Sequence, residues 1–272
     1  TGISMDLSTL DVADTAGAVW DMGHSTNVAQ FREAGHRLVG WAQNMMITDK
    51  HGDILYTGYN ATPCRTYLER TTDGHFAADA DPRLLIDGTK YQGFSIPSVN
   101  GVVDETPGKT DPYRCVIPFD DWPVALNPKA GFIVNANNDF GNTSIDGKLG
   151  DDVWYLGGPW VLGYRAQAIH DRVAEAVKTS TADVAKMSAI QGTTASPLGA
   201  QFVPALLGAL KKAKAASAAT DDADKRLHAL YLAEQVTMDV VQTRLEAWQK
   251  RGYPAESGVE TFYHSPTAQQ KT

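Results

Sequence analysis

Three asparagines, Asn135, Asn137 and Asn138, follow directly on a short apolar run over residues 131–135. Carboxamide side chains are uncommon in strands, which suggests that these are present for hydrogen bonding. An amide NH2 aimed at the oxygen of a tetrahedral intermediate can accelerate acyl transfer by about 100- to 1000-fold. The same asparagines could instead satisfy the backbone groups of a turn. The residues alone leave both interpretations open.

Other catalytic patterns are missing from the sequence. It has no Gly-x-Ser-x-Gly elbow, no phosphate loop, no His-Glu-x-x-His motif and no paired cysteines with metal-site spacing. The seven histidines do not cluster, which gives no support to a self-contained Ser-His-Asp hydrolase. The net charge of −8 argues against a nucleic-acid binder, which normally carries a basic face.

The chain has two cysteines, Cys64 and Cys115. Two thiols that lie 51 positions apart do not form a zinc pattern, which needs close pairs and further ligands. They can form one disulfide if the protein is exported, or remain two buried thiols if it is not.

The elements that must position these residues follow from the apolar periodicity and the turn signals. The turn Asp49–Asp53, with Gly52 inside it, is typical of a strand hairpin. The expected elements are a helical pair over 11–42, a hairpin over 44–59, an irregular segment over 60–130, a strand with the asparagine cluster over 131–139, and helices over 160–250. This order predicts a layered α+β domain. Because few strands are expected, either strands lie hidden in residues 60–130 or the chain forms part of a larger sheet.

Several boundaries can be predicted more closely. Ser25 or Thr26 is expected to cap the second helix of the pair, and Ser180 with Asp183 to start a later helix. Residues 211–220, rich in Ala and Lys, are expected to form an exposed connection. Residues 221–250 are expected to form one long helix.

Several blocks of the chain, taken in order, resemble the penicillin acylase family of N-terminal-nucleophile amidohydrolases. No block by itself is specific to the family, but the joint order of the blocks over roughly residues 12–210 is specific to it. The blocks are Gln43-Asn44 with Asp49 to Ile54, Pro63-Cys64-Arg65, Asp81-Pro82-Arg83, Ile117-Pro118-Phe119, Asn127-Pro128 with Gly131 to Asn138, and Gly163-Tyr164-Arg165 with Gln191 in a later helical segment.

The resemblance implies roles for individual residues. Asn137 matches the family's catalytic Asn, whose side-chain amide helps to form the oxyanion hole. Arg165 matches an Arg that positions that Asn. Gln43 lies where the family has an acyl-pocket residue, and its polarity departs from the apolar pocket of phenylacetyl-type enzymes. Pro82, with Asp152 or its neighbour Asp151, lies near positions that bind calcium in some members, so a structural calcium is expected although the chemistry needs no cofactor.

The family's nucleophile is the first residue of its large chain, a Ser, Thr or Cys with a free amine. Thr1 does not match it, because the 136 positions between Thr1 and Asn137 are far fewer than the family's spacing. The resemblance therefore implies that residues 1–272 are a single internal fragment of the large chain. We expect the nucleophile, and a further C-terminal part, to lie outside this sequence.

The expected fold is then part of the αββα layers of N-terminal-nucleophile hydrolases. The expected function is part of an acylase that cleaves the amide between an acyl group and an amine nucleus, with β-lactams, acyl-homoserine lactones and acyl-peptides as family substrates. The expected partners are a small acylated amine and the remaining acylase chains, including the small chain and the nucleophile-bearing segment, with no nucleic acid and no membrane span. The isolated chain is expected to be inactive.

Family members are commonly exported, which implies a periplasmic or secreted protein and favours a Cys64–Cys115 disulfide flanking an inserted loop over Val99–Asp111. Two other hypotheses predict different experimental results. A non-catalytic binding module on the same scaffold would use residues 60–130 for docking and tolerate loss of Asn137. A self-contained hydrolase with Thr1 as nucleophile would lose activity when its α-amine is blocked.

Overall fold

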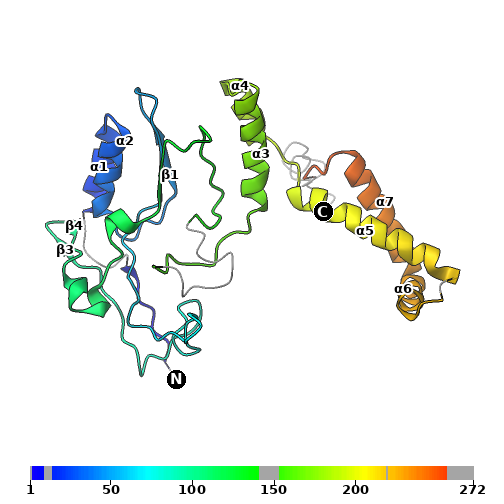
Figure 1. The fold of residues 1–272 in the computed structure, drawn as a ribbon, viewed down its shortest axis with the longest axis horizontal. Helices are drawn as coiled ribbons and strands as arrows, with labels where there is room; N and C mark the ends of the chain where they lie inside the picture. The colour runs from blue at the N-terminus through cyan, green and yellow to red at the C-terminus, as the bar shows by residue number, and fades with distance from the viewer. Residues whose placement is uncertain (1, 9–13, 141–152, 219, 256–272) are drawn as a thin grey trace, which may run out of the picture. The chain divides into compact units, whose positions relative to one another are not determined.

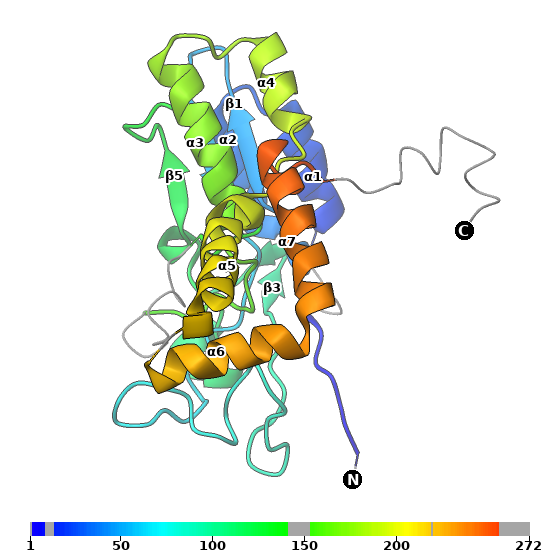
Figure 2. The same ribbon diagram turned by 90° about the vertical axis from the view of Figure 1, so that its right-hand side faces the viewer.

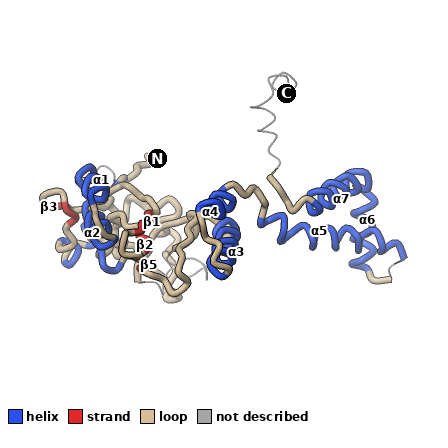
Figure 3. Tube along the Cα trace, turned by 90° about the horizontal axis from the view of Figure 1, so that it is seen from above, coloured by secondary structure: helices blue, strands red, loops and turns tan. Residues whose placement is uncertain are grey.

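The computed structural model describes residues 2–8, 14–140, 153–218 and 220–255. The chain divides into two compact units, Thr1–Ser180 and Thr181–Thr272. The first unit combines short helices and strands with long irregular segments, whereas the described part of the second is built of helices (Figure 3). Together they make the α+β mixture that the sequence predicts. No helix within the described ranges is both long and apolar enough to cross a membrane.

The helical pair expected over 11–42 consists of α1 (Thr15–His24) and α2 (Val28–Ala34), which lie side by side (Figure 1). The second helix ends earlier than expected, because a 3-10 turn, Gly35–Arg37, follows it and residues 38–42 are not helical. Its residues 11–13 lie outside the described ranges. Asp14 caps α1 by accepting from the backbone N–H of Gly17 at 2.8 Å. Asn27, rather than Ser25 or Thr26, caps α2, because its Oδ1 accepts from Gln30 N at 2.9 Å.

The hairpin expected over 44–59 consists of β1 (Met45–Thr48) and β2 (Ile54–Thr57), which pair antiparallel with Thr48 opposite Ile54. In its turn, the Asp49 carboxylate accepts from His51 N at 2.8 Å and from Asp53 N at 3.2 Å. Gly52 has a φ of 88°, a conformation that favours glycine. Local turn chemistry therefore fixes this hairpin.

A third strand, β5 (Val124–Leu126), pairs antiparallel with the other edge of β2 and gives the order β1-β2-β5. Directly after this strand, Asn127 Oδ1 accepts a hydrogen bond from Ile54 N at 2.9 Å. This strand lies inside residues 60–130, the segment expected to be irregular. One of the two alternatives raised by the sequence, that this segment contains further strands, is therefore confirmed. The same segment holds a two-stranded hairpin, β3 (Ser98–Val99) with β4 (Val102–Val103), at the start of the expected insert.

The strand expected over residues 131–135 is wrong. No strand is assigned to these residues, and no described segment pairs with them. A strand requires a partner backbone as well as apolar side chains, and the antiparallel ladder already ends at Leu126. Beyond it, Asn127 and Gly131 take positive φ values of 48° and 75°, which turn the chain away from the sheet.

The irregular segment 60–130 is ordered because it supplies much of the core of the first unit. Three short 3-10 helices punctuate it, Pro107–Lys109, Pro112–Arg114 and Phe119–Asp121. One buried cluster gathers side chains from the end of the hairpin segment, from residues 60–130 and from the chain beyond the asparagine cluster, namely Tyr59, Cys64, Ile117, Phe119, Trp122 and Leu156. The irregular backbone is thus folded around aromatic side chains.

The last helix of the first unit, α3 (Tyr164–Lys178), begins four residues after Trp160, where the helical period returns. The second unit contains α4 (Val184–Gln191), α5 (Pro197–Ala215), α6 (Asp222–Ala233) and α7 (Gln235–Lys250). Asp183 alone caps α4, with its side chain accepting from Lys186 N at 2.7 Å.

Two boundaries in the second unit differ from the prediction. α5 continues to Ala215, so the Ala- and Lys-rich stretch is helical over much of its length. The helix expected over 221–250 breaks at Glu234, where φ is −124°, into α6 and α7. Figure 2 shows α5 and α7 packed side by side, with α6 joining them. The break lets apolar faces of three helices meet, which one straight helix would not allow.

Candidate active site

The asparagine cluster forms a tight loop in which the three side chains have different tasks. Asn135 Oδ1 accepts from Asn137 N at 2.9 Å, and Asn138 Oδ1 accepts from Ala136 N at 3.0 Å. These two carboxamides shape the backbone, as the turn interpretation expects. Asn137 has a left-handed φ of 59°, and its carbonyl accepts from Val161 N at 3.0 Å. Its side chain is thereby left to act outside the loop.

Arg165, in the first turn of α3, holds that side chain. Its Nη2 donates to the carbonyl of Ala136 at 2.6 Å and to Oδ1 of Asn137. A guanidinium can only donate, so the amide oxygen of Asn137 must face Arg165. The two N–H groups on Nδ2 therefore point elsewhere, and no described residue accepts from them. Asn137 and Arg165, the pair predicted from the sequence, are therefore in contact, and the Nδ2 group of Asn137 is left as a donor.

A cavity of about 300 Å³ lies beside this loop within the first unit. Gln43 and Asn137 both line it, so the structure brings together the expected acyl-pocket residue and the expected oxyanion donor. Both side chains are exposed, whereas Trp122 on the cavity wall is only 5% exposed. The cavity therefore runs from the surface inward.

Several other residues that line the cavity were not functional candidates from the sequence. Besides Gln43 and Asn137, the polar lining side chains are Asn44, Asn60 and Thr62, and the large apolar ones are Trp122, Phe140, Leu156 and Trp160. Asn44 could have been found as the neighbour of Gln43 in the hairpin block. The tryptophans lie far away in sequence, and only the fold brings them here.

The lining of the cavity carries no ionisable acid or base among the described residues. Two titratable side chains bind lining residues: Arg165 donates to Asn137 Oδ1, and the Tyr56 hydroxyl donates to Asn44 Oδ1 at 2.6 Å. Burial raises the pKa of Tyr56 well above its ordinary value, so the hydroxyl keeps its proton and stays a donor. The lining itself is thus polar through amides, indoles and a hydroxyl, and the Arg165 guanidinium is bound to one of its amides.

Of the expected calcium residues, only Pro82 lies within the described part of the chain. Asp152 and Asp151 lie outside the described residues. Beside Pro82, the carboxylate of Asp81 is taken up by Arg83, with Nε to Oδ1 at 2.9 Å and Nη2 to Oδ2 at 2.7 Å. Within the described ranges no group of three potential acidic, His or Cys ligands exists. The residues described around Pro82 do not fit a calcium site by themselves, since the ion prefers six to eight oxygens.

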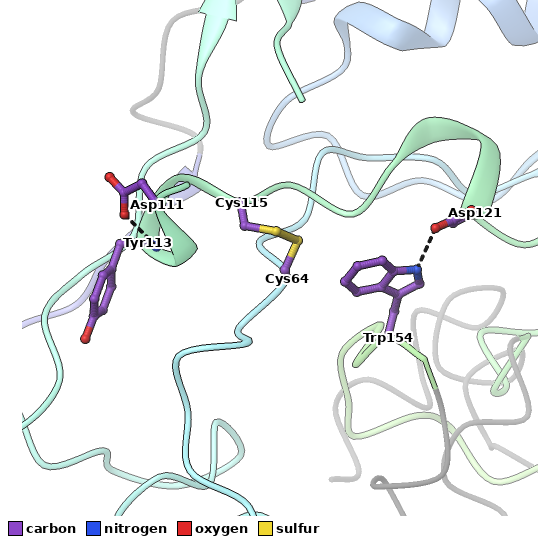
Figure 4. The surroundings of a disulfide bond; sticks show 6 residues. All are labelled: Cys64, Asp111, Tyr113, Cys115, Asp121 and Trp154. Carbon is purple, nitrogen blue, oxygen red and sulfur yellow. Dashed lines mark hydrogen bonds between the residues drawn. A yellow bond between two sulfur atoms is a disulfide. The ribbon is translucent and has the colours of Figure 1, made fainter. Parts of the chain in front are cut away.

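Cys64 and Cys115 form a disulfide with their Cα atoms 5.3 Å apart (Figure 4). Backbone bonds flank it, with Cys64 N donating to the carbonyl of Cys115 at 2.9 Å and Ile117 N to that of Thr62 at 2.9 Å. Figure 4 also shows Trp154, whose indole donates to Asp121 at 3.0 Å. The disulfide therefore ties together two segments, one leading to Thr62 and the other to Trp122, that both line the cavity.

Comparison with protein-family models matches residues 2–268 to the penicillin amidase family. The chain belongs to the penicillin amidase family. This confirms the resemblance drawn from the ordered sequence blocks, and it assigns the protein to acylase-type amide hydrolases. A comparison with curated proteins finds no significant match. That the chain is an internal part of the large chain remains a prediction, and Thr1 lies outside the described residues.

Proposed function

We propose that this penicillin amidase family protein binds the acyl part of an amide substrate in the 300 Å³ cavity and stabilises the oxyanion with Nδ2 of Asn137. The observation that supports this most directly is the bond from Arg165 to Asn137 Oδ1. It fixes the amide so that its donor end is free before any substrate arrives. Such preorganised donors are effective because they need no reorientation during the reaction.

The reaction proceeds in two steps. The Ser, Thr or Cys nucleophile on another segment of the acylase adds to the carbonyl carbon and gives its proton to its own α-amine. Negative charge develops on the carbonyl oxygen, where Asn137 donates to it. The C–N bond then breaks and the amine leaves with a proton. Water attacks the acyl-enzyme in the second step, releasing the carboxylic acid and restoring the nucleophile.

The partner chains, the location and the structural calcium expected from the sequence are part of the same proposal. The chain works together with a small chain and a nucleophile-bearing segment, and is inactive by itself. The disulfide supports a periplasmic or secreted location, because such bonds persist in oxidising compartments. A structural calcium at Pro82 and Asp152 stays a prediction. It can be tested by measuring whether calcium raises the melting temperature and whether Asp152→Asn abolishes that rise.

The test of the oxyanion role is Asn137→Asp in the assembled enzyme. Aspartate keeps the shape of the side chain and can still pair with Arg165, but it replaces the Nδ2 donor with an acceptor. We expect kcat for amide hydrolysis to fall about 100- to 1000-fold with little change in KM. Asn100→Asp is the matched control, because Asn100 also has a positive φ, 53°, but lies in the β3–β4 turn away from the cavity.

The outcome separates the two functional hypotheses. A kcat that stays within about threefold of the wild type would refute the role of Asn137 and favour the non-catalytic binding module. A loss as large in Asn100→Asp would show that the effect comes from backbone strain.

A further inference from the structure

Arg65 is a charged side chain that has no part in the candidate active site. It directly follows Cys64 of the disulfide, and its backbone takes a left-handed φ of 54°. Glycine or asparagine adopts this conformation more easily than arginine does. The position therefore holds a guanidinium at some cost to the backbone, which raises the question of what the guanidinium binds.

Two aromatic rings hold the guanidinium of Arg65 in place. Its Cζ lies over the ring of Phe94, 5.7 Å from the centroid, and over the ring of Tyr155, 5.5 Å from the centroid. A cation within about 6 Å of a ring centroid is attracted by the ring. Phe94 packs against one buried cluster, and Tyr155, which is 3% exposed, belongs to another. The guanidinium is therefore fixed between two parts of the core of the first unit.

The N–H groups of Arg65 have no acceptor within the described part of the chain. No described residue accepts a hydrogen bond from the guanidinium, and the side chains that interact with it electrostatically are those of Tyr67 and Tyr155. Burial lowers the pKa of Arg65, and no described carboxylate opposes that shift. Its nitrogens remain accessible to water, because none of them is among the fully buried polar atoms that lack a partner. An acceptor from outside the chain can therefore reach them.

Two acidic residues near the same rings are engaged elsewhere. The carboxylate of Asp81, which interacts electrostatically with Tyr155, is bound by Arg83 with Nη2 at 2.7 Å from Oδ2. Asp6 Oδ2 accepts from the backbone N–H of Phe94 at 2.6 Å. Neither acid forms an ion pair with Arg65. Arg83 is thus balanced by Asp81, whereas Arg65 has no counter-ion among the described residues.

The charge and the surroundings of Arg65 limit which ligand fits. The planar guanidinium can donate two parallel hydrogen bonds to the two oxygens of a carboxylate. One cation balances one negative charge, whereas a phosphate group carries more than one at neutral pH. The neighbouring rings are those of Phe94, Tyr155 and Tyr67, and Tyr67 stacks on Tyr113 at 4.3 Å. These rings offer contact area to an apolar group attached to the carboxylate.

We propose that Arg65 is the centre of a binding site for small monocarboxylates with an apolar body. The guanidinium donates to the carboxylate oxygens, and the rings beside it contact the apolar body. This site differs from the cavity beside Asn137, which Arg65 does not line, and it does not depend on the proposed function. A carboxylic acid is also the class of product that the proposed reaction releases, so the site gives such a product a second place to bind.

The test measures ligand binding to the 272-residue chain, which requires no turnover. The probes are benzoate, its neutral counterpart benzamide, and inorganic phosphate, each titrated at neutral pH by calorimetry. In parallel, NMR follows the arginine Nε–H signals of ¹⁵N-labelled protein, and Arg65→Lys identifies the signal of Arg65. Arg32→Met is the matched control for Arg65→Met. Arg32 also lies over a ring, 4.1 Å from the centroid of Phe119, but it already donates to the carbonyl of Phe119 at 3.1 Å.

We expect benzoate to bind about tenfold or more tightly than either benzamide or phosphate, and to move the Arg65 Nε–H signal. Arg65→Met should weaken benzoate binding about 10- to 100-fold, and Arg32→Met should change it by less than about twofold. An Arg65 signal that benzoate leaves unmoved, or equal affinities for benzoate and benzamide, would overturn the proposal. So would tighter binding of phosphate, or an affinity for benzoate that survives Arg65→Met. The NMR titration uses the wild-type chain, so it decides the question even if Arg65→Met does not fold.

Discussion

Removing the disulfide should destabilise the first unit by an amount that can be worked out from chain entropy. Cys64 and Cys115 are 51 positions apart, and closing a loop of that length lowers the entropy of the unfolded chain enough to stabilise the fold by about 4 kcal/mol. We therefore expect Cys64→Ala/Cys115→Ala to lose about 4 kcal/mol of unfolding free energy. That is a large share of the 5 to 15 kcal/mol typical of a domain.

The native structure should survive this loss. The backbone bonds between Cys64 and Cys115 and between Ile117 and Thr62 do not depend on the sulfur atoms. Cys64 is also 2% exposed within the aromatic cluster, so the two alanines will add a packing cost to the entropic one. Reduced wild-type protein keeps both thiols and separates these contributions, because it lacks only the bond.

The assay is equilibrium unfolding in guanidinium chloride followed by tryptophan fluorescence. Five of the six tryptophans belong to the first unit, and only Trp248 belongs to the second. With an m-value of about 4 kcal/mol/M, a loss of 4 kcal/mol shifts the midpoint down by about 1 M. A reduced wild type that loses less than about 1 kcal/mol would refute the loop-entropy argument. A reduced wild type as stable as the oxidised protein, beside a weakened double mutant, would assign the whole effect to packing.

Two further predictions concern charged side chains. Arg165→Met removes the bond to Asn137 Oδ1 and frees the amide to rotate. Because such a bond contributes about 1.5 to 3 kcal/mol, kcat should fall about 10- to 100-fold at nearly constant KM. A change confined to KM would contradict the orienting role. The side-chain bonds from Arg83 hold the pKa of Asp81 below its ordinary value, so this pair stabilises the fold at neutral pH and ceases to do so as pH falls through the lowered pKa. Asp81→Asn should therefore be about 1 kcal/mol less stable than wild type at pH 7 by thermal melting, and the difference should shrink as pH falls through the lowered pKa of Asp81, whereas a pH-independent difference would refute the assignment.

The elements fixed by local chemistry were predictable from the sequence. The hairpin β1–β2 follows from the Asp49–Asp53 turn, where one carboxylate binds two backbone N–H groups within four residues. The helices follow from apolar periodicity, but some boundaries differ: Asn27 caps α2 in place of Ser25 or Thr26, and α2 ends at Ala34 rather than near residue 42. The Glu234 break was missed because residues 221–250 keep a continuous helical period across it.

Non-local pairing could not be predicted. β5 and residues 131–135 both have apolar character, but only β5 pairs with β2. That choice depends on which segment is brought alongside β2 in space, and no local pattern records it. The same limit applies to the cavity, where Trp122 and Trp160 become functional candidates only once they lie beside Gln43 and Asn137.

The asparagine cluster shows why residue type alone left two interpretations open. Both hold, for different residues, because Asn135 and Asn138 bind the loop's own backbone while Asn137 is held by Arg165, 28 positions away. A carboxamide has a donor end and an acceptor end, and whichever end the fold uses leaves the other for a ligand. Around this cavity the fold uses the acceptor ends of Asn44, Asn60 and Asn137. The bond that fixes Asn137 in its loop therefore also leaves its Nδ2 donor available to an acceptor oxygen.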